Sequence, residues 1–198
     1  MSPQDKIIHV ANKLGLSSLK DMQGSTGAVY DVDLENSGLI FSNASQHAQP
    51  QVANINANKF EVNEALLVES IAFYGFDNDD STPFAYNLSQ FYNSDTVLLF
   101  DLVIGNKRVM KDTPVFVAGQ PSTFATSAFR LQPGLELNFA PRHQIFMEGA
   151  GILIPPQIEW SINYKLYNLR TGAIITPSIT IGAYLFGTRV LLNFNTTI

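Results

Sequence analysis

Asp77, Asp79 and Asp80 are the densest group of side chains in this chain that could do chemistry, with three carboxylates in four residues. Calcium is bound by several carboxylate and carbonyl oxygens on a flexible loop, so these residues are a candidate calcium site. The segment lacks the glycine of an EF-hand loop, and Leu88 occupies the twelfth position, where that loop has a bidentate glutamate. We therefore favour the alternative, a solvated loop between two strands.

The three histidines, His9, His47 and His143, show no spacing typical of metal ligands or of a catalytic triad. The chain has no cysteine, which excludes disulfides, thiolate metal ligands and cysteine nucleophiles. Phosphate-binding glycine loops and nucleophile-elbow motifs are also absent from the sequence. We expect solvated or structural histidines, no cofactor and no enzymatic activity.

A glycosidase needs two carboxylates that face each other across a cleft. Glu136, Glu148 and Glu159 are the available acids, but nothing in their spacing brings them together. A sugar-binding face would need exposed aromatic rings. Trp160 and Tyr164 instead lie on the apolar side of a strictly alternating segment, which predicts core packing. A non-catalytic carbohydrate-binding or adhesin-like module is still the alternative function.

The charge of the chain argues against a nucleic-acid surface. Net charge is −5 and only 15% of residues are charged, against about 25% in typical soluble domains. Binding to phosphates needs clustered Lys and Arg, and the densest basic group is Lys107, Arg108 and Lys111 at an expected hairpin tip. A surface of low charge is compatible with extensive contact to protein partners, and also with an ordinary extracellular β domain.

The N-terminus carries the signals of one amphipathic helix. Ser2 is a suitable N-cap, Pro3 fits the first helical position, and Asp5 is placed to complete a capping box. Gly15 supplies a C-terminal stop. The apolar stripe consists of Ile7, Val10, Ala11 and Leu14.

Residues 23–58 are mostly polar, are interrupted by glycines, and contain few large apolar side chains that could be buried. Ordering a residue costs about 1–2 kcal/mol of backbone entropy, which such a segment offsets poorly by itself. We therefore expect residues 1–58 to form a helix and an extended arm that lies on a neighbouring subunit. The candidate interface residues are Ile7, Val10, Leu14, Leu39, Ile40 and Phe41.

Residues 59–198 alternate between apolar and polar positions and are divided by Gly and Pro turns. Long strands are expected from Phe60, over 97–104, over 158–166, and from Ile179 with an interruption at Gly187. About eight strands with regular turns predict an all-β fold: an antiparallel β-sandwich, as a single jelly roll. The predicted interior is Phe60, Leu66, Val68, Leu98, Phe100, Ile158, Trp160, Ile162 and Ile181.

The N-terminal residues show neither a basic nor an apolar signal-peptide region, so we expect no signal peptide. No apolar run reaches the roughly 18–20 residues of a membrane span. We expect the protein to begin in a cytoplasm and to have no membrane-spanning segment.

Two stretches, Arg-His-Gln-Ile-Phe-Met-Glu-Gly at 142–149 and Ile-Pro-Pro-Gln-Ile-Glu-Trp at 154–160, look like material from phage structural proteins. Together with the β core, the capped helix and the polar arm, they resemble a viral capsid-type subunit. The resemblance implies a virion protein assembled in the host cytoplasm, either forming a capsid or decorating one. It further implies that its partners are copies of itself and other virion proteins, with no catalysis and no cofactor.

Overall fold

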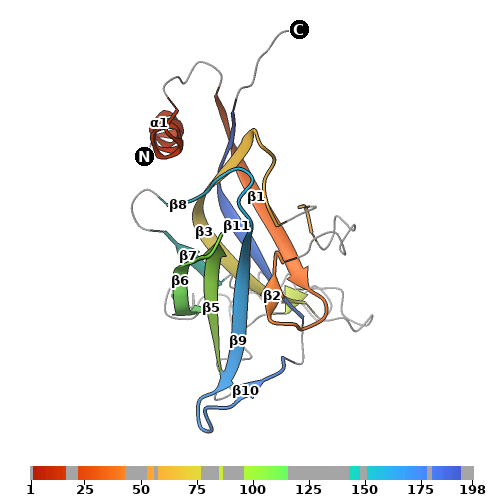
Figure 1. The fold of residues 1–198 in the computed structure, drawn as a ribbon. Helices are drawn as coiled ribbons and strands as arrows, with labels where there is room; N and C mark the ends of the chain where they lie inside the picture. The colour runs from red at the N-terminus through yellow and green to blue at the C-terminus, as the bar shows by residue number, and fades with distance from the viewer. Residues whose placement is uncertain are drawn as a thin grey trace, which may run out of the picture.

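The computed structural model describes residues 2–16, 22–42, 53–55, 58–76, 85–86, 96–115, 143–147, 151–177 and 180–192 of the chain. The elements, in chain order, are α1 (Pro3–Leu14), β1 (Gln23–Asp33), β2 (Leu39–Ile40), β3 (Glu64–Phe76), β4 (Ala85–Tyr86), β5 (Thr96–Ile104), β6 (Lys107–Pro114), β7 (His143–Phe146), β8 (Ile152–Ile154), β9 (Trp160–Asn168), β10 (Ile174–Ile175) and β11 (Thr180–Leu191) (Figure 1).

The strands form two antiparallel sheets. The first sheet has the order β1-β11-β3-β4, and β7 and β8 also pair with β3. The second sheet has the order β10-β9-β5-β6, and β2 also pairs with β9. One core lies between the sheets and draws side chains from both. The predicted antiparallel β-sandwich is confirmed, while the jelly-roll connectivity stays a prediction.

The core is built around aromatic contacts between distant segments. Trp160 on β9 packs against Phe41, with ring centroids 4.4 Å apart, and against Phe60 at 5.8 Å. Across the sandwich, Phe73 of β3 lies 4.8 Å from Phe100 of β5. Of the nine residues predicted inside, all but Ile158 are buried.

Two strand starts differ from the prediction. Ile158 is 40% exposed because β9 begins only at Trp160, after a turn in which Gln157 has φ 60°. Val62 is 73% exposed because the chain turns before β3, where the Glu64 amide donates to the Glu61 carbonyl. The alternation of apolar and polar residues therefore begins earlier in the sequence than either strand begins in the structure.

A β-bulge divides β3 and β11. Phe186 pairs with Ser70 and Gly187 pairs with Val68, which leaves Glu69 as the extra residue. An extra residue reverses which side chains face the core. Leu66 and Val68 contact the core before the bulge, and Ile71 and Phe73 contact it afterwards. The predicted interruption at Gly187 is thus a bulge within one continuous strand.

The expectation that residues 1–58 form an arm outside the β core is wrong for two described segments. β1 pairs with β11 from Gln23 opposite Leu191 to Asp33 opposite Ile181, and β2 pairs with β9. Strand β1 looked irregular because it is an edge strand with a largely exposed first half, where no apolar period is required. Residues 43–52 and 56–57 of the expected arm lie outside the described residues.

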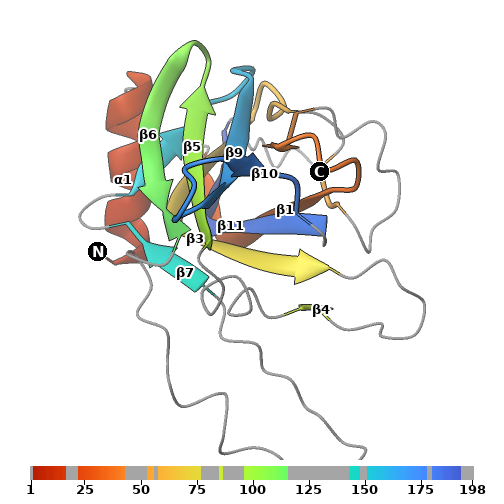
Figure 2. The ribbon, with the colours of Figure 1, turned by 90° about the horizontal axis from the view of Figure 1, so that it is seen from below.

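The predicted N-terminal helix is confirmed. Ser2 and Asp5 form a reciprocal capping box, and Gly15 ends the helix with φ 69°. The apolar face of α1 packs on the outer face of the first sheet. There Val10 of the helix forms a second cluster with Ala65, Leu67, Val190 and Leu192. Figure 2 shows the helix beside the sandwich, away from the second sheet's β10.

Candidate interaction site

Most of the residues predicted to do chemistry are not brought together by the described structure. Asp77, Asp79, Asp80 and His47 lie outside the described residues, and so does the side chain of His143. His9 is half-buried on α1. In the part of the chain that the structure describes, no group of three or more His, Cys, Asp or Glu could hold a metal ion.

Of the three carboxylates considered for glycoside cleavage, only Glu159 lies within the described residues. Glu159 is exposed just before β9, while Glu136 and Glu148 lie outside the described residues. Trp160 and Tyr164 are buried, so the prediction that they pack in the core is confirmed. These two rings are therefore not available to stack on a sugar.

The six interface candidates divide into two groups. Val10, Ile40 and Phe41 are completely buried within this chain, so their assignment to a subunit interface is wrong. They were misassigned because β2 and α1 pack on the chain's own sheets. Leu14 packs against the second cluster, the Ile7 side chain lies beside Gly24, and Leu39 is 40% exposed.

Asp33, at the end of β1, is a buried carboxylate with several hydrogen-bond donors around it. Its Oδ1 accepts from the Ser37 amide and hydroxyl, both at 3.0 Å. Its Oδ2 accepts from the amides of Gly38 (2.7 Å) and Leu39 (3.3 Å) and from the Tyr164 hydroxyl at 2.8 Å. Five donors use the lone pairs of this buried carboxylate. Asp33 therefore holds the β1–β2 loop against β9 and has no capacity left for a base or a metal ligand.

The Tyr164 hydroxyl is strongly perturbed by this contact. Burial, followed by the hydrogen bond to Asp33 and the charge of that carboxylate, raises the pKa of Tyr164 far above its ordinary value of 10.0. The hydroxyl therefore remains a donor to Asp33 throughout the neutral range. It ties two segments 131 residues apart in sequence.

We expect Tyr164→Phe to destabilise the protein at pH 7 and to matter less at pH 11. Losing a donor to a buried carboxylate costs about 1–3 kcal/mol of unfolding free energy. A group whose pKa is higher in the folded state contributes fully below its unfolded pKa of about 10, and loses about 1.4 kcal/mol per pH unit above it. Urea unfolding at pH 7 and pH 11 measures both effects.

Tyr167→Phe is the matched control for this experiment, since Tyr167 is on the same strand but only partly buried. It should leave stability nearly unchanged at both pH values. A Tyr164→Phe deficit that is the same at pH 7 and pH 11 would contradict the assigned role of the hydroxyl.

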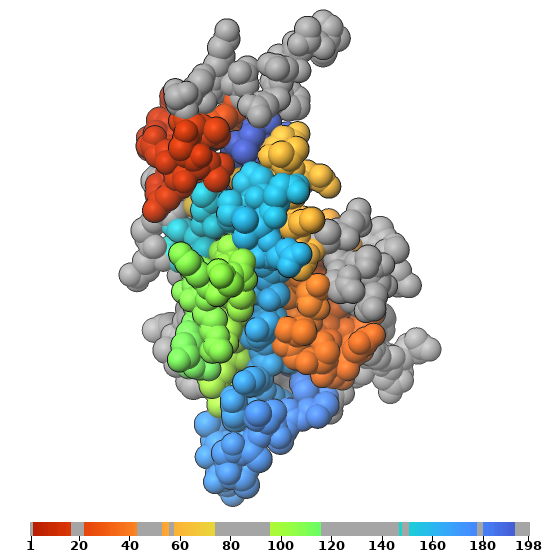
Figure 3. Space-filling model, viewed as in Figure 1, coloured from red at the N-terminus to blue at the C-terminus, as the bar shows by residue number. Residues whose placement is uncertain are grey.

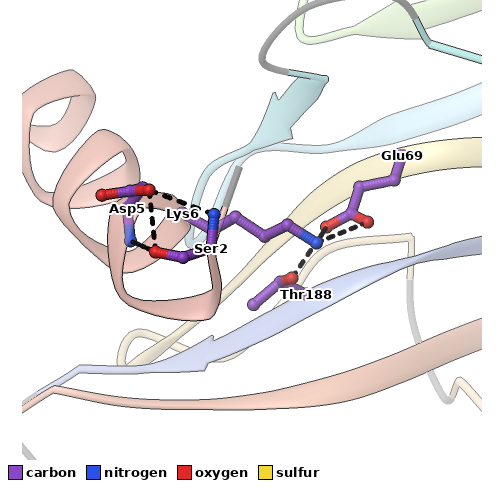
Figure 4. A network of polar contacts seen from close by, with 5 residues as sticks. All are labelled: Ser2, Asp5, Lys6, Glu69 and Thr188. Atoms are coloured by element: carbon purple, nitrogen blue, oxygen red, sulfur yellow. Dashed lines mark hydrogen bonds and ion pairs between the residues drawn. The ribbon is translucent and has the colours of Figure 1, made fainter.

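A second polar network fixes α1 to the bulge (Figure 4). Lys6 donates to Glu69 at 2.8 Å, and the Thr188 hydroxyl donates to the same carboxylate at 2.8 Å. Partial burial raises the pKa of Glu69, but the hydrogen bonds from Lys6 and Thr188, with the charge of Lys6, leave it below its ordinary value of 4.5. Glu69 is thus ionised at neutral pH and positions the helix.

The β9–β10 hairpin exposes two large aliphatic side chains. Leu169 and Ile174 are each 63% exposed. The hairpin lies at one end of the molecule and projects from its body in the space-filling view (Figures 1 and 3). Aliphatic side chains on a projecting tip are available to insert into an apolar pocket of a partner.

The same hairpin is internally braced. The Asn168 side-chain oxygen accepts from the amides of Arg170 (2.9 Å) and Thr171 (3.1 Å). The Asn168 carbonyl also accepts from the Gly172 amide at 2.8 Å, and the Asn168 amide donates to the Ala173 carbonyl at 2.9 Å. A preformed loop loses less entropy when it binds. We call this segment, residues 168–175, the hairpin tip, and it is the best candidate interaction site in the described residues.

The sequence indicates the turn of the hairpin tip but not the exposure of its aliphatic side chains. The Thr171-Gly172 pair signalled a turn, and Gly172 has φ 67°. The flanking aliphatic residues resembled ordinary strand positions, because the sequence does not reveal that the turn projects beyond the body. Asn168, two residues before Arg170, was the available signal for a braced turn.

Comparison with protein-family models, with curated proteins and with solved structures finds no match. Among the described residues, no helix is both long and apolar enough to cross a membrane. A proposal for the function therefore rests on the sequence, the surfaces and the polar networks of the chain itself.

Proposed function

We propose that this chain is a structural virion protein that acts by associating with copies of itself and with other virion proteins, in a capsid or as its decoration. The observation that carries the association is the hairpin tip. It presents Leu169 and Ile174 to solvent on a loop that hydrogen bonds hold in one conformation. Such a surface is suited to repeated, identical docking.

The polar networks support the same proposal. Asp33 and Glu69 are each occupied by donors that fix a loop or a helix. Carboxylates used in this way stabilise a scaffold and do not turn over a substrate. The virion assignment itself draws on the resemblance of 142–149 and 154–160 to phage structural proteins, and on the low charge of the chain.

Replacing Leu169 and Ile174 together by Ser is expected to weaken self-association at least about a hundredfold. A buried aliphatic side chain contributes about 1.5–3 kcal/mol, and 1.4 kcal/mol is a factor of about ten in affinity. Folding stability should change by less than about 0.5 kcal/mol per site, because both side chains are exposed. Sedimentation velocity over a concentration series measures the change.

Val62→Ser is the control variant, because Val62 is 73% exposed but belongs to the turn before β3. It should associate like the wild type. Equal association of the double variant and the wild type would remove the hairpin tip from the interface.

The virion assignment has a separate test. The native protein, followed by antibody in the organism that encodes it, should sediment with particles that protect nucleic acid from nuclease. Recovery only in the soluble fraction, away from any particle, would contradict the assignment. Electron microscopy of the particle fraction would then show where the chain is placed.

A further inference from the structure

Strand β1 is an edge strand with one side paired. Its full length pairs with β11, and in the described residues no strand pairs with the opposite side. Asn54 shows which backbone groups point to that open side. The Asn54 amide donates to the Tyr30 carbonyl at 3.2 Å, and the Asn54 side-chain oxygen accepts from the Tyr30 amide at 2.8 Å. The Asn54 side-chain nitrogen donates to the Ala28 carbonyl at 2.7 Å.

Backbone direction alternates along a strand, so Gly24 and Thr26 also point their N–H and C=O groups to the open side. Asn54 thus covers the edge from the Ala28 carbonyl onward and leaves the preceding residues uncovered by any described segment. Ser25 and Thr26 are exposed. We call residues 24–28 the free edge.

The other sheet edges carry features that discourage strand addition. β6 has exposed Lys107, Arg108 and Lys111, and its register with β5 shifts twice. β2, β4 and β10 are only two residues long, β8 has three residues and β7 has four. Charges, irregular register and short length are the common means of protecting an edge. The free edge has none of these, since its sequence is Gly-Ser-Thr-Gly-Ala and its pairing with β11 is regular.

We propose that the free edge pairs with the free edge of a second copy, antiparallel about a two-fold axis at Thr26. In this register Thr26 faces its counterpart and Gly24 faces Ala28 of the other copy. Thr26 would exchange both backbone hydrogen bonds with its counterpart, and the Ala28 N–H would donate to the Gly24 carbonyl of the other copy, while the Ala28 carbonyl keeps its bond from Asn54. The two sheets would then continue into each other across the dimer.

The length and the charge of the free edge fit this occupant. The partner strand must end soon after Gly24, because Asn54 blocks the edge beside Tyr30, and β1 does begin at Gln23. Two-fold symmetry places Thr26 opposite its own copy, so a charge at this position would repel its counterpart. The five residues are uncharged and small. The inference rests on the proposed function in that the occupant is another copy of the chain.

Thr26→Pro in the full-length chain tests the pairing. Proline removes the outward N–H and places its ring at the edge, while the bonds to β11 come from the neighbouring residues. Thr26→Val is the matched control, because it keeps the N–H and a β-branched side chain. Thr26→Lys is a second variant, in case proline impairs folding, since it places two like charges at the axis.

Sedimentation velocity should show that Thr26→Pro and Thr26→Lys need at least about tenfold more protein to associate than the wild type and Thr26→Val. Amide exchange at Thr26 and Ala28 should slow in the associated wild type. Unchanged association in both variants, with rapid exchange at these amides, would overturn the edge pairing and leave self-association standing. Loss of association in Thr26→Val would also overturn it, because the backbone is intact there. A wild type that is monomeric at every concentration would overturn both proposals.

Discussion

Deletion of residues 1–58 is expected to abolish folding. The deletion removes the entire β1–β11 pairing and takes Ile40 and Phe41 out of the core. Truncating one large buried side chain costs about 2–5 kcal/mol, and the total stability of a domain is about 5–15 kcal/mol. Losing Val29, Ile40 and Phe41 together is therefore comparable with the whole stability.

Deletion of residues 1–16 is the informative comparison. It removes α1, whose contribution is the burial of Val10, with Leu14 packed against the same cluster. The sandwich core stays intact, so this variant should melt cooperatively at a lower temperature. Circular dichroism and Trp160 fluorescence follow both variants. A cooperative melt for the 1–58 deletion would contradict the placement of β1 and β2 inside the fold.

This expectation differs from the one drawn from sequence, in which residues 1–58 formed a helix and an extended arm on a neighbouring subunit. The error has a physical origin in β1. Val29 is its residue in the main core, and Gln23, Ser25 and Thr26 are exposed. Hydrophobic periodicity detects strands that bury one whole face. An edge strand of Gly, Ser and Thr buries too little for the pattern to appear.

Elements with a complete buried face were predictable. Strand β5 occupies Thr96–Ile104 where an apolar run indicated it, and β9 buries every second residue from Trp160 to Leu166. The helix α1 was predictable from local rules alone, since Ser2, Asp5 and Gly15 make the expected caps. Local signals therefore defined the helix through its caps and the strands through one completely buried face.

The candidate site depended on contacts that sequence does not encode locally. The hydrogen bond from the Tyr164 hydroxyl to the Asp33 carboxylate joins residues 131 positions apart in the sequence. The exposure of Leu169 and Ile174 depends on how far the hairpin tip projects from the sandwich. Both features follow from how the sheets are placed, which propensity and spacing leave open.

Gly187→Ala is expected to cost at least about 4 kcal/mol of unfolding free energy, a value reached only by severe packing or backbone defects. A Cβ at this position would lie 2.8 Å from the Leu67 carbonyl carbon and 3.1 Å from the Glu69 nitrogen, and still closer to the Leu67 carbonyl oxygen. All three are backbone atoms of the β-bulge, so no side-chain rotation relieves the overlap.

Gly172→Ala is the matched control for this substitution. Gly172 has φ 67° but nothing within 4 Å of an added Cβ, so Ala there should cost only about 1–2 kcal/mol of left-handed strain. Urea unfolding of both variants measures the difference. Because the bulge positions Glu69 for Lys6, Gly187→Ala should also accelerate amide exchange in α1, which Gly172→Ala should leave unchanged. Equal costs for the two substitutions would show that close backbone approach at the bulge does not determine how β3 and β11 pair.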